Sequence, residues 1–393
     1  MEAYAIEWFS LVLRWLHLIV AIAWIGSSFY FVWLDNNLRA PLDEALQRKG
    51  VAGELWAVHG GGFYNPQKYL VAPAALPAHL HWFKWESYST WLSGAALISV
   101  LYYVQAPTWM IDPARAALTP AQAIAIGLGT LAGGWLVYDG LCRLLATRSP
   151  LLLGAAYYAF VVGVAWGLSQ VLSGRAAFLH VGAMIATAMT ANVFFHIIPG
   201  QKKTVAQMQR GQTPDPQYGK LAKQRSVHNN YLTLPVLFCM ISNHYAFVYG
   251  NTHAWAALAL ILLAGALIRH FFNQRHRGQA QWRYPLGGVA LLALVAVWFA
   301  PARALIQPGG PVDFAQVQQV VAMRCAACHA EHPSLVAAAP AGVLLDTPER
   351  IRAARQRIWI QAVQVRAMPL GNITHITDDE RALLDRWATR GDN

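Results

Sequence analysis

The chain has 393 residues, of which 56% are hydrophobic and only 12% are charged. A typical soluble domain is about 25% charged, so this composition excludes an ordinary soluble protein and places the chain among membrane proteins. The net charge of +11 lies entirely in residues 1–303, because residues 304–393 hold 9 basic and 9 acidic side chains. A basic excess in the apolar part is a signal of membrane topology, so we expect a lipid bilayer and no nucleic acid as partner.

Eight apolar runs follow one another in residues 1–303, each close to the roughly 20 residues that cross a bilayer. They lie near residues 8–34, 85–105, 120–145, 150–172, 176–199, 229–250, 253–272 and 284–302. The first run is long enough to span a bilayer, and no cleavage site of small residues accompanies it, so we expect no removable signal peptide. The pattern predicts an all-α polytopic membrane bundle of about eight spans.

The segments between the runs alternate in charge. One set carries 17 Lys and Arg, and the set that alternates with it carries two. The basic set is 35–84, 143–150, 200–228 and 269–283, and the other set is 106–119, 173–175 and 251–252. By the positive-inside rule the basic set is cytoplasmic, and eight spans then put both termini in the periplasm. We therefore expect a multi-pass protein of the bacterial inner membrane.

Ionisable side chains inside membrane spans are costly and are functional candidates. By their depth in the spans, His17, His180 and His244 fall in the outer half of the membrane. One interpretation is a heme b held by His17 and by either His180 or His244, with Arg14 on the same helix face pairing with a heme carboxylate. The other is hydrogen bonding between helices. Both interpretations stay open.

A second polar cluster falls at the cytoplasmic side of the spans. Its candidate catalytic residues are His81, Lys84, Glu86, His196, His228 and Asn229. One interpretation is a small-molecule site in which Lys84 offsets a negative charge and a His or Glu takes up a proton. The other is anchoring at the membrane interface, of which Trp82 and Trp85 are typical.

Three weaker patterns lie in the same spans. Asp139 and Arg143 have the i,i+4 spacing of a local ion pair. Arg269, at the end of its span, fits snorkelling toward the cytoplasmic interface. A faint internal repeat aligns His17 with His180, which divides the bundle into four plus four spans, and such repeats often hold a site at their interface.

The tail contains the heme-attachment motif Cys325-Ala-Ala-Cys328-His329. In this motif the two thiols bind a heme covalently and the imidazole ligates its iron. Met368 follows His329 by 39 residues, and its thioether completes the His/Met ligation typical of electron-transfer cytochromes. A zinc site needs more ligands than the neighbouring His332 adds, and a redox dithiol explains neither His329 nor Met368. We therefore predict one heme c.

The surroundings of the motif predict a small all-α domain of the class I cytochrome c type. We divide the chain into a membrane domain of residues 1–303, a linker of residues 304–312 and a cytochrome c domain of residues 313–393. Asp313 is a helix cap leading toward the motif, residues 350–366 predict a middle helix, and Thr377 with Glu380 forms a capping-box start for a last helix through Trp387. Heme c is attached outside the bacterial cytoplasm, which agrees with a periplasmic tail.

Taken together, the chain resembles the bacterial membrane-bound urate oxidases, or urate hydroxylases, with a C-terminal cytochrome c domain. The segments that carry the resemblance are Arg14-Trp15-Leu16-His17 through Trp33-Leu34-Asp35-Asn36, Gly60-Gly61-Gly62-Phe63-Tyr64, His81-Trp82-Phe83-Lys84-Trp85-Glu86, Phe195-His196-Ile197-Ile198-Pro199-Gly200-Gln201, His228-Asn229-Asn230-Tyr231, and the heme motif with Met368-Pro369. The membrane half also looks like the four-helix membrane protoporphyrinogen oxidases, which bind heme b.

This resemblance implies hydroxylation of urate to 5-hydroxyisourate, with electrons passing to heme c and on to a soluble cytochrome c or a terminal oxidase. Oxygen is then not an obligatory acceptor. The alternative is a non-catalytic cytochrome subunit that relays electrons from a dehydrogenase or from quinol. A transporter or sensor with a redox tail is a third possibility, and the sequence separates these three poorly.

Overall fold

A computed structural model describes residues 2–146, 148–300, 312–336 and 338–390. The chain is predominantly helical. In chain order its elements are α1 (Glu2–Asn37), α2 (Glu44–Arg48), β1 (Val51–Glu54), β2 (Ala57–His59), β3 (Gly62–Tyr64), β4 (Gln67–Tyr69), α3 (Trp85–Ile98), η1 (Ser99–Tyr103), α4 (Ala106–Trp109), α5 (Pro120–Leu145), α6 (Pro150–Val171), α7 (Gly174–Ala191), η2 (Asn192–Ile197), α8 (Ile198–Gln209), α9 (Pro216–Ile241), η3 (Ser242–His244), α10 (Ala246–Tyr249), α11 (Ala254–Arg275), α12 (Arg283–Trp298), α13 (Phe314–Arg324), η4 (Pro340–Gly342), α14 (Pro348–Ala353), α15 (Arg355–Ile358), η5 (Trp359–Gln364), η6 (Leu370–Asn372) and α16 (Asp378–Arg390).

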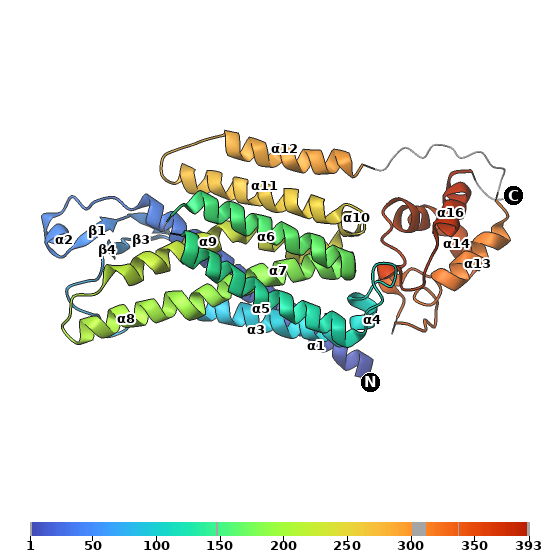
Figure 1. Cartoon of the computed structure of the whole chain (residues 1–393), viewed down its shortest axis with the longest axis horizontal. Coiled ribbons are helices and arrows are strands. Elements are labelled where there is room, and N and C mark those ends of the chain that lie inside the picture. The colour runs from blue at the N-terminus through green and yellow to red at the C-terminus, as the bar shows by residue number, and fades with distance from the viewer. Residues whose placement is uncertain (1, 147, 301–311, 337, 391–393) are drawn as a thin grey trace.

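The long helices lie side by side and form one elongated bundle, with the tail beyond one end (Figure 1). The N-terminus of α1 lies at the tail end, together with α4 and α10. The strands and α8 lie at the opposite end. We call these the tail end and the far end. The basic segments that the sequence places in the cytoplasm connect helices at the far end.

The eight apolar runs coincide with α1, α3, α5, α6, α7, α9, α11 and α12. Among the described residues, five helical segments are long and apolar enough to cross a membrane: Trp8–Asn37, Pro120–Leu145, Pro150–Val171, Gly174–Gln209 and Ala254–Arg275. The other three helices are shorter or more polar. The expected run at 229–250 needs correction, because α9 begins at Pro216 and ends at Ile241, after which the chain turns through η3 and α10.

Local signals set where the helices begin. Thr119 and Gln122 form a reciprocal capping box before α5. Asp215 accepts a hydrogen bond from the backbone N–H of Gln217 at the start of α9, where Pro216 fits the first helical position. These caps satisfy backbone N–H groups that have no partner inside the helix.

The connection between α1 and α3 contains strands that the sequence did not predict. β1 pairs with β4 and β2 pairs with β3, both antiparallel. The β2–β3 turn is Gly60-Gly61, with φ angles of 57° and 80°. Two consecutive positive φ angles suit the tight hairpin turn that glycine allows. The far end is therefore covered by a small β layer within an otherwise helical protein.

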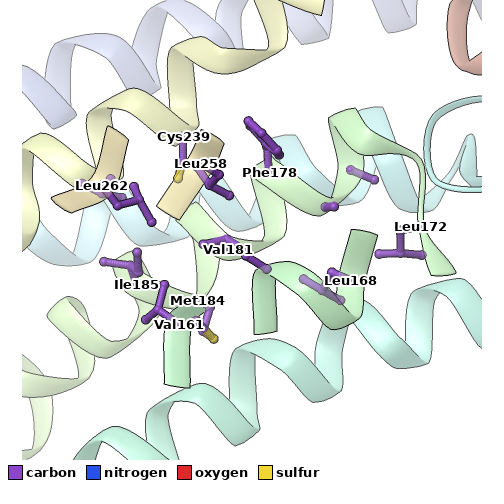
Figure 2. Close-up of a cluster of buried hydrophobic side chains, with 14 of the residues drawn as sticks. Val161, Leu168, Leu172, Phe178, Val181, Met184, Ile185, Cys239, Leu258 and Leu262 are labelled. Atoms are coloured by element: carbon purple, nitrogen blue, oxygen red, sulfur yellow. The ribbon is translucent and has the colours of Figure 1, made fainter. Parts of the chain in front are cut away.

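The core of the bundle is built around α7. Figure 2 shows its side chains Phe178, Val181, Met184 and Ile185 facing residues of α6, α9 and α11. In the apolar stretch of the continuous helix formed by α7, η2 and α8, 61% of the residues are buried, whereas in the apolar stretch of α1 only 6% are buried. The exposed side chains of α1 include Trp15, Leu18 and Ile22, and an apolar surface of this kind suits contact with lipid.

The tail has a separate hydrophobic core formed by residues from Val312 to Trp387. Asp313 caps α13 through the N–H of Ala315, and Thr377 and Glu380 form the expected capping box before α16. Trp387 is fully buried, as predicted for core. The expected middle helix at 350–366 is divided into α14, α15 and η5, with a break at Ala354. Most of the linker proposed at 304–312 lies outside the described residues.

Candidate functional site

A cavity of about 520 Å³ opens at the far end between α1, α9 and α11. The start of α3, η2, the start of α8 and β4 with the residue before it complete its wall. Its polar and charged lining consists of Ser27, Ser28, Asp35, Asn36, Gln67, Lys68, Glu86, Ser87, Gln201, Lys223, Ser226, Asn229, Tyr231, Asn273, Gln274 and Arg277. We call this space the far cavity.

The charged groups of the far cavity favour a negatively charged ligand. Asp35 is paired with both Lys68 and Lys223, and its Oδ2 lies 2.6 Å from Lys223 Nζ. Arg277 donates from Nε to Asn36 Oδ1 at 3.1 Å. Three cations and two carboxylates, Asp35 and Glu86, therefore line the cavity, which leaves one positive charge in excess and complements a monoanion.

Glu86 has the geometry of a proton acceptor. It lies in the first turn of α3, where the helix dipole stabilises a carboxylate. Among the described residues its Oε2 atom is buried without a hydrogen-bond partner. A buried carboxylate oxygen that lacks a partner is costly unless a ligand or a water completes it. The neighbouring Ser87 is fixed by a 3.4 Å hydrogen bond to Thr190.

A buried polar network stands behind the cavity wall. Asp139 Oδ1 lies 2.7 Å from Arg225 Nη2 and 2.7 Å from His196 Nε2. Arg225 also donates to Asn192 Oδ1 at 3.1 Å. Asn192 in turn donates from Nδ2 to Asn229 Oδ1 at 2.8 Å. The network thus runs from α5 through α9 and η2 to a side chain in the cavity wall.

A branch of this network contains Tyr138 and His228. Asn192 Nδ2 donates to the Tyr138 hydroxyl at 3.0 Å, and that hydroxyl lies 2.9 Å from His228 Nδ1. The Asn229 amide donates to the Met189 carbonyl at 2.9 Å. Because its oxygen and its amide nitrogen both have partners, Asn229 is held in one orientation.

The structure separates the six candidate catalytic residues into three groups. Glu86 and Asn229 line the far cavity. His196 and His228 belong to the network behind it. His81 and Lys84 lie outside both: His81 is exposed with its ring edge-on to Phe83, and Lys84 lies over the Trp85 ring. A catalytic role for these last two residues stays a prediction, and so does the interfacial interpretation.

The sequence analysis missed the centre of this network. Arg225 was counted among the loop cations, yet its side chain is 2% exposed. The start signal at Asp215-Pro216 would have extended α9 and placed Arg225 on the same helix face as Asn229, four residues later. The pair Asp139–Arg143 is confirmed at 2.7 Å. The prediction that Arg269 snorkels toward the cytoplasmic interface is wrong.

Arg269 is instead buried between α1 and α9. It is 4% exposed, donates from Nε to Asn230 Oδ1 at 2.8 Å and lies over the Phe29 ring at 3.9 Å. Asn230 reaches the Ser28 carbonyl at 3.2 Å. Arg269 therefore ties three helices together beside the far cavity.

The outer histidines give little support for a heme b. His17 Nδ1 lies 3.0 Å from Ser93 Oγ. His180 is fully buried: its Nδ1 bonds to the Ala176 carbonyl, and its Nε2 lies 3.3 Å from the Tyr103 hydroxyl. A Cβ at Gly127 would lie 2.6 Å from that same Nε2, so helix α5 occupies the space that a porphyrin needs.

The other two residues of this group are exposed. His244 lies in η3 beyond the end of α9, and Arg14 lies on α1, where its Nε donates to Ser10. The geometry therefore does not fit a porphyrin on His180. The intramembrane heme stays a prediction, which a pyridine hemochrome assay for non-covalent heme tests.

The tail fits a heme c. His329 Nδ1 lies 3.0 Å from the Val343 carbonyl. Donation to that carbonyl fixes the ring and leaves Nε2 for iron, which is the usual arrangement of a ligating histidine. Cys325 packs against the tail core, and burial raises the pKa of its thiol to about 11. Met368 lies on the loop after η5, where its carbonyl accepts a 3.0 Å hydrogen bond from Arg381.

The comparison with known families agrees with the urate oxidase part of the sequence resemblance. The model of the family described as urate oxidase N-terminal matches residues 3–300. No curated protein and no solved structure matches the chain. The family match covers the helix bundle, both ends of the buried network and the far cavity, and it stops before the tail. The chain belongs to the urate oxidase N-terminal family.

Proposed function

We propose that this protein oxidises urate in the far cavity and passes the electrons to a heme c on the tail. Membership of the urate oxidase N-terminal family supports the substrate. The observation that carries the location is the buried Glu86 Oε2 atom, which has no hydrogen-bond partner among the described residues and lies in a cavity with one excess positive charge. Urate is a planar monoanion at neutral pH, which suits this lining.

The reaction balances with water as the oxygen source. A water oxygen bonds to C5 of urate, and two electrons and two protons leave, which gives 5-hydroxyisourate. Glu86 accepts a proton from the attacking water. Lys223 and Arg277 offset the charge of the bound anion, and Asn229, held by Asn192, orients the purine. Heme c, once attached to the tail, would supply a one-electron acceptor outside the cavity, so the two electrons would reach it one at a time and each would pass on to a soluble cytochrome c or a terminal oxidase.

The orientation of the chain is part of the same proposal. We place the far end in the cytoplasm and the tail in the periplasm of a bacterium, with the eight helices of the apolar runs, including the three shorter or more polar ones, crossing the inner membrane. The charge asymmetry between connecting segments supports this placement. Urate from the cytosol then reaches the far cavity directly, and the tail meets a soluble cytochrome c or a terminal oxidase.

Reduction of the heme by urate in the absence of oxygen tests the proposal. In purified full-length protein, urate should reduce heme c, and Glu86→Gln should slow that reduction about 10²–10⁴-fold while urate still binds. Glu44→Gln is the matched control, because the Glu44 side chain is 82% exposed and outside the cavity. In a parallel assay in air, stoichiometric peroxide with a heme that stays oxidised would contradict the proposal. Reduction by quinol but not by urate would favour the cytochrome-subunit alternative.

A further inference from the structure

A second cavity lies where the tail meets the bundle. Its volume is about 470 Å³. The bundle contributes residues of α4, the start of α7 and the turn after α10. The tail contributes the loop around Met368 and the start of α16. The two parts are in contact there, because a Cβ on Gly250 would lie 3.5 Å from the Val365 carbonyl and 3.7 Å from the Arg366 carbonyl. We call this space the junction cavity.

The junction cavity is positively charged. Its charged lining consists of Asp112, Arg115, Arg175, Arg366, Asp378 and Arg381. Four arginines and two aspartates leave two positive charges in excess. A space with this excess favours a ligand that carries two negative charges.

Three of the four arginines already have partners. Arg115 donates to Asp112 at 3.2 Å and to the Ser169 carbonyl at 2.5 Å. Arg366 lies 3.1 Å from Asp378. Arg381 donates to the carbonyls of Ala362 and Met368. These three side chains are therefore held in place by the protein itself.

Arg175 is different. Its guanidinium stacks on Trp109 at 4.3 Å and lies 5.9 Å from the Tyr102 ring. Within the part of the chain that the structure describes, it has no carboxylate partner, and its Nε atom is buried without a hydrogen bond. A stacked guanidinium is preorganised to bind a carboxylate with two parallel hydrogen bonds.

We propose that the junction cavity receives the two carboxylates of the heme on the tail, and that Arg175 is the bundle residue that binds one of them. The proposal rests on the attachment of heme c to Cys325 and Cys328. A heme carries two propionate groups, which match the two excess positive charges. Arg366, Ala367 and Leu370, which flank Met368, line the cavity, so the cavity adjoins the heme-binding loop. Binding of the loaded tail then brings the heme to the bundle at Arg175 and Trp109.

The midpoint potential of heme c tests this inference without urate. Arg175→Gln leaves a carboxylate without its cation, which favours the ferric state. The equilibrium constant for reduction should fall about tenfold, which is ~59 mV for one electron, and Arg175→Lys should restore much of it. Arg283→Gln, at the far end of the bundle, is the matched control and should cause no shift. A normal heme spectrum with an unchanged potential in Arg175→Gln would overturn the proposal.

A dissolved anion is the competing occupant, and inorganic phosphate is its probe. With heme carboxylates in the cavity, added phosphate should leave the potential of the unmodified protein unchanged. A phosphate-dependent potential that Arg175→Gln abolishes would assign the cavity to free anions instead. Because no urate is present, failure of this test is separable from failure of urate oxidation. Absence of covalent heme from the spectrum would overturn both.

Discussion

At the far end of the bundle, the buried ion pair of Asp139 and Arg225 joins two helices, and His196 also contacts Asp139. At the tail end, the charges come from two parts of the chain, and Arg175 lacks a carboxylate partner among the described residues. The charges of the network behind the far cavity are therefore paired within the bundle, whereas the junction cavity contains an arginine without a carboxylate partner among the described residues. This difference fits the proposed substrate site at one end and the proposed docking site for a charged group at the other.

The two ends should lie on opposite sides of the membrane. Alkaline phosphatase needs the oxidising periplasm to form its disulfides. A fusion after the C-terminus should therefore be active, and a fusion in the turn at residues 210–215, between α8 and α9, should be inactive. The measurement is phosphatase activity per amount of expressed fusion. The reverse pattern would invert the orientation and move the far cavity to the periplasmic side.

Met368→Ala should change the tail end and leave the far end intact. Loss of the thioether ligand should abolish the weak near-infrared sulfur–iron band and lower the potential of heme c. Urate binding, measured calorimetrically, should stay at the value of the unmodified protein. Met323→Ala is a control, since Met323 is an exposed residue of the same tail. An unchanged spectrum would mean that Met368 is not the ligand.

Asp139→Asn should lower the stability of the protein. Its effect should be smaller than that of Met368→Ala and confined to the far end. It leaves Arg225, which is 2% exposed, without its anionic partner. Breaking a buried ion pair in this way costs about 3–5 kcal/mol, so the Tm should fall and urate oxidation should weaken. Arg143→Gln is the control, because this partner of Asp139 is 72% exposed and its loss should cost less than about 1 kcal/mol. Equal effects of the two substitutions would show that the network does not support the cavity.

The sequence predicts those parts of the molecule whose structure depends on residues that are neighbours in the chain. The CxxCH motif, the cap at Asp313, the capping box at Thr377 and the positions of the long helices all depend on residues close together in the chain. The candidate site was only partly predicted, because its parts meet through tertiary packing. Glu86 and Asn229 were identified as polar groups at the cytoplasmic side.

Arg225 and Asn192 were not identified, for two different reasons. A cation near a helix end looks the same in sequence whether it faces water or a carboxylate on another helix. Asn192 lies within an apolar run and has no sequence neighbour that reveals its partners. The position of Arg175 in the junction cavity could not be predicted either, since it depends on how the tail packs against the bundle.

The π-helical segment η2, Asn192–Ile197, joins α7 to α8 without a break. Wide turns of this type are rare in proteins as a whole, and those that occur are often found at functional sites. Here the segment holds Asn192 and His196, which both contact the Asp139–Arg225 pair. Each residue of a regular α-helix adds about 100° of rotation, so a wide turn takes up one extra residue without rotating α8 against α7. The length of this segment, together with its wide turn, therefore sets how α8 is rotated relative to α7. Insertions or deletions in it are constrained even where single side chains are not.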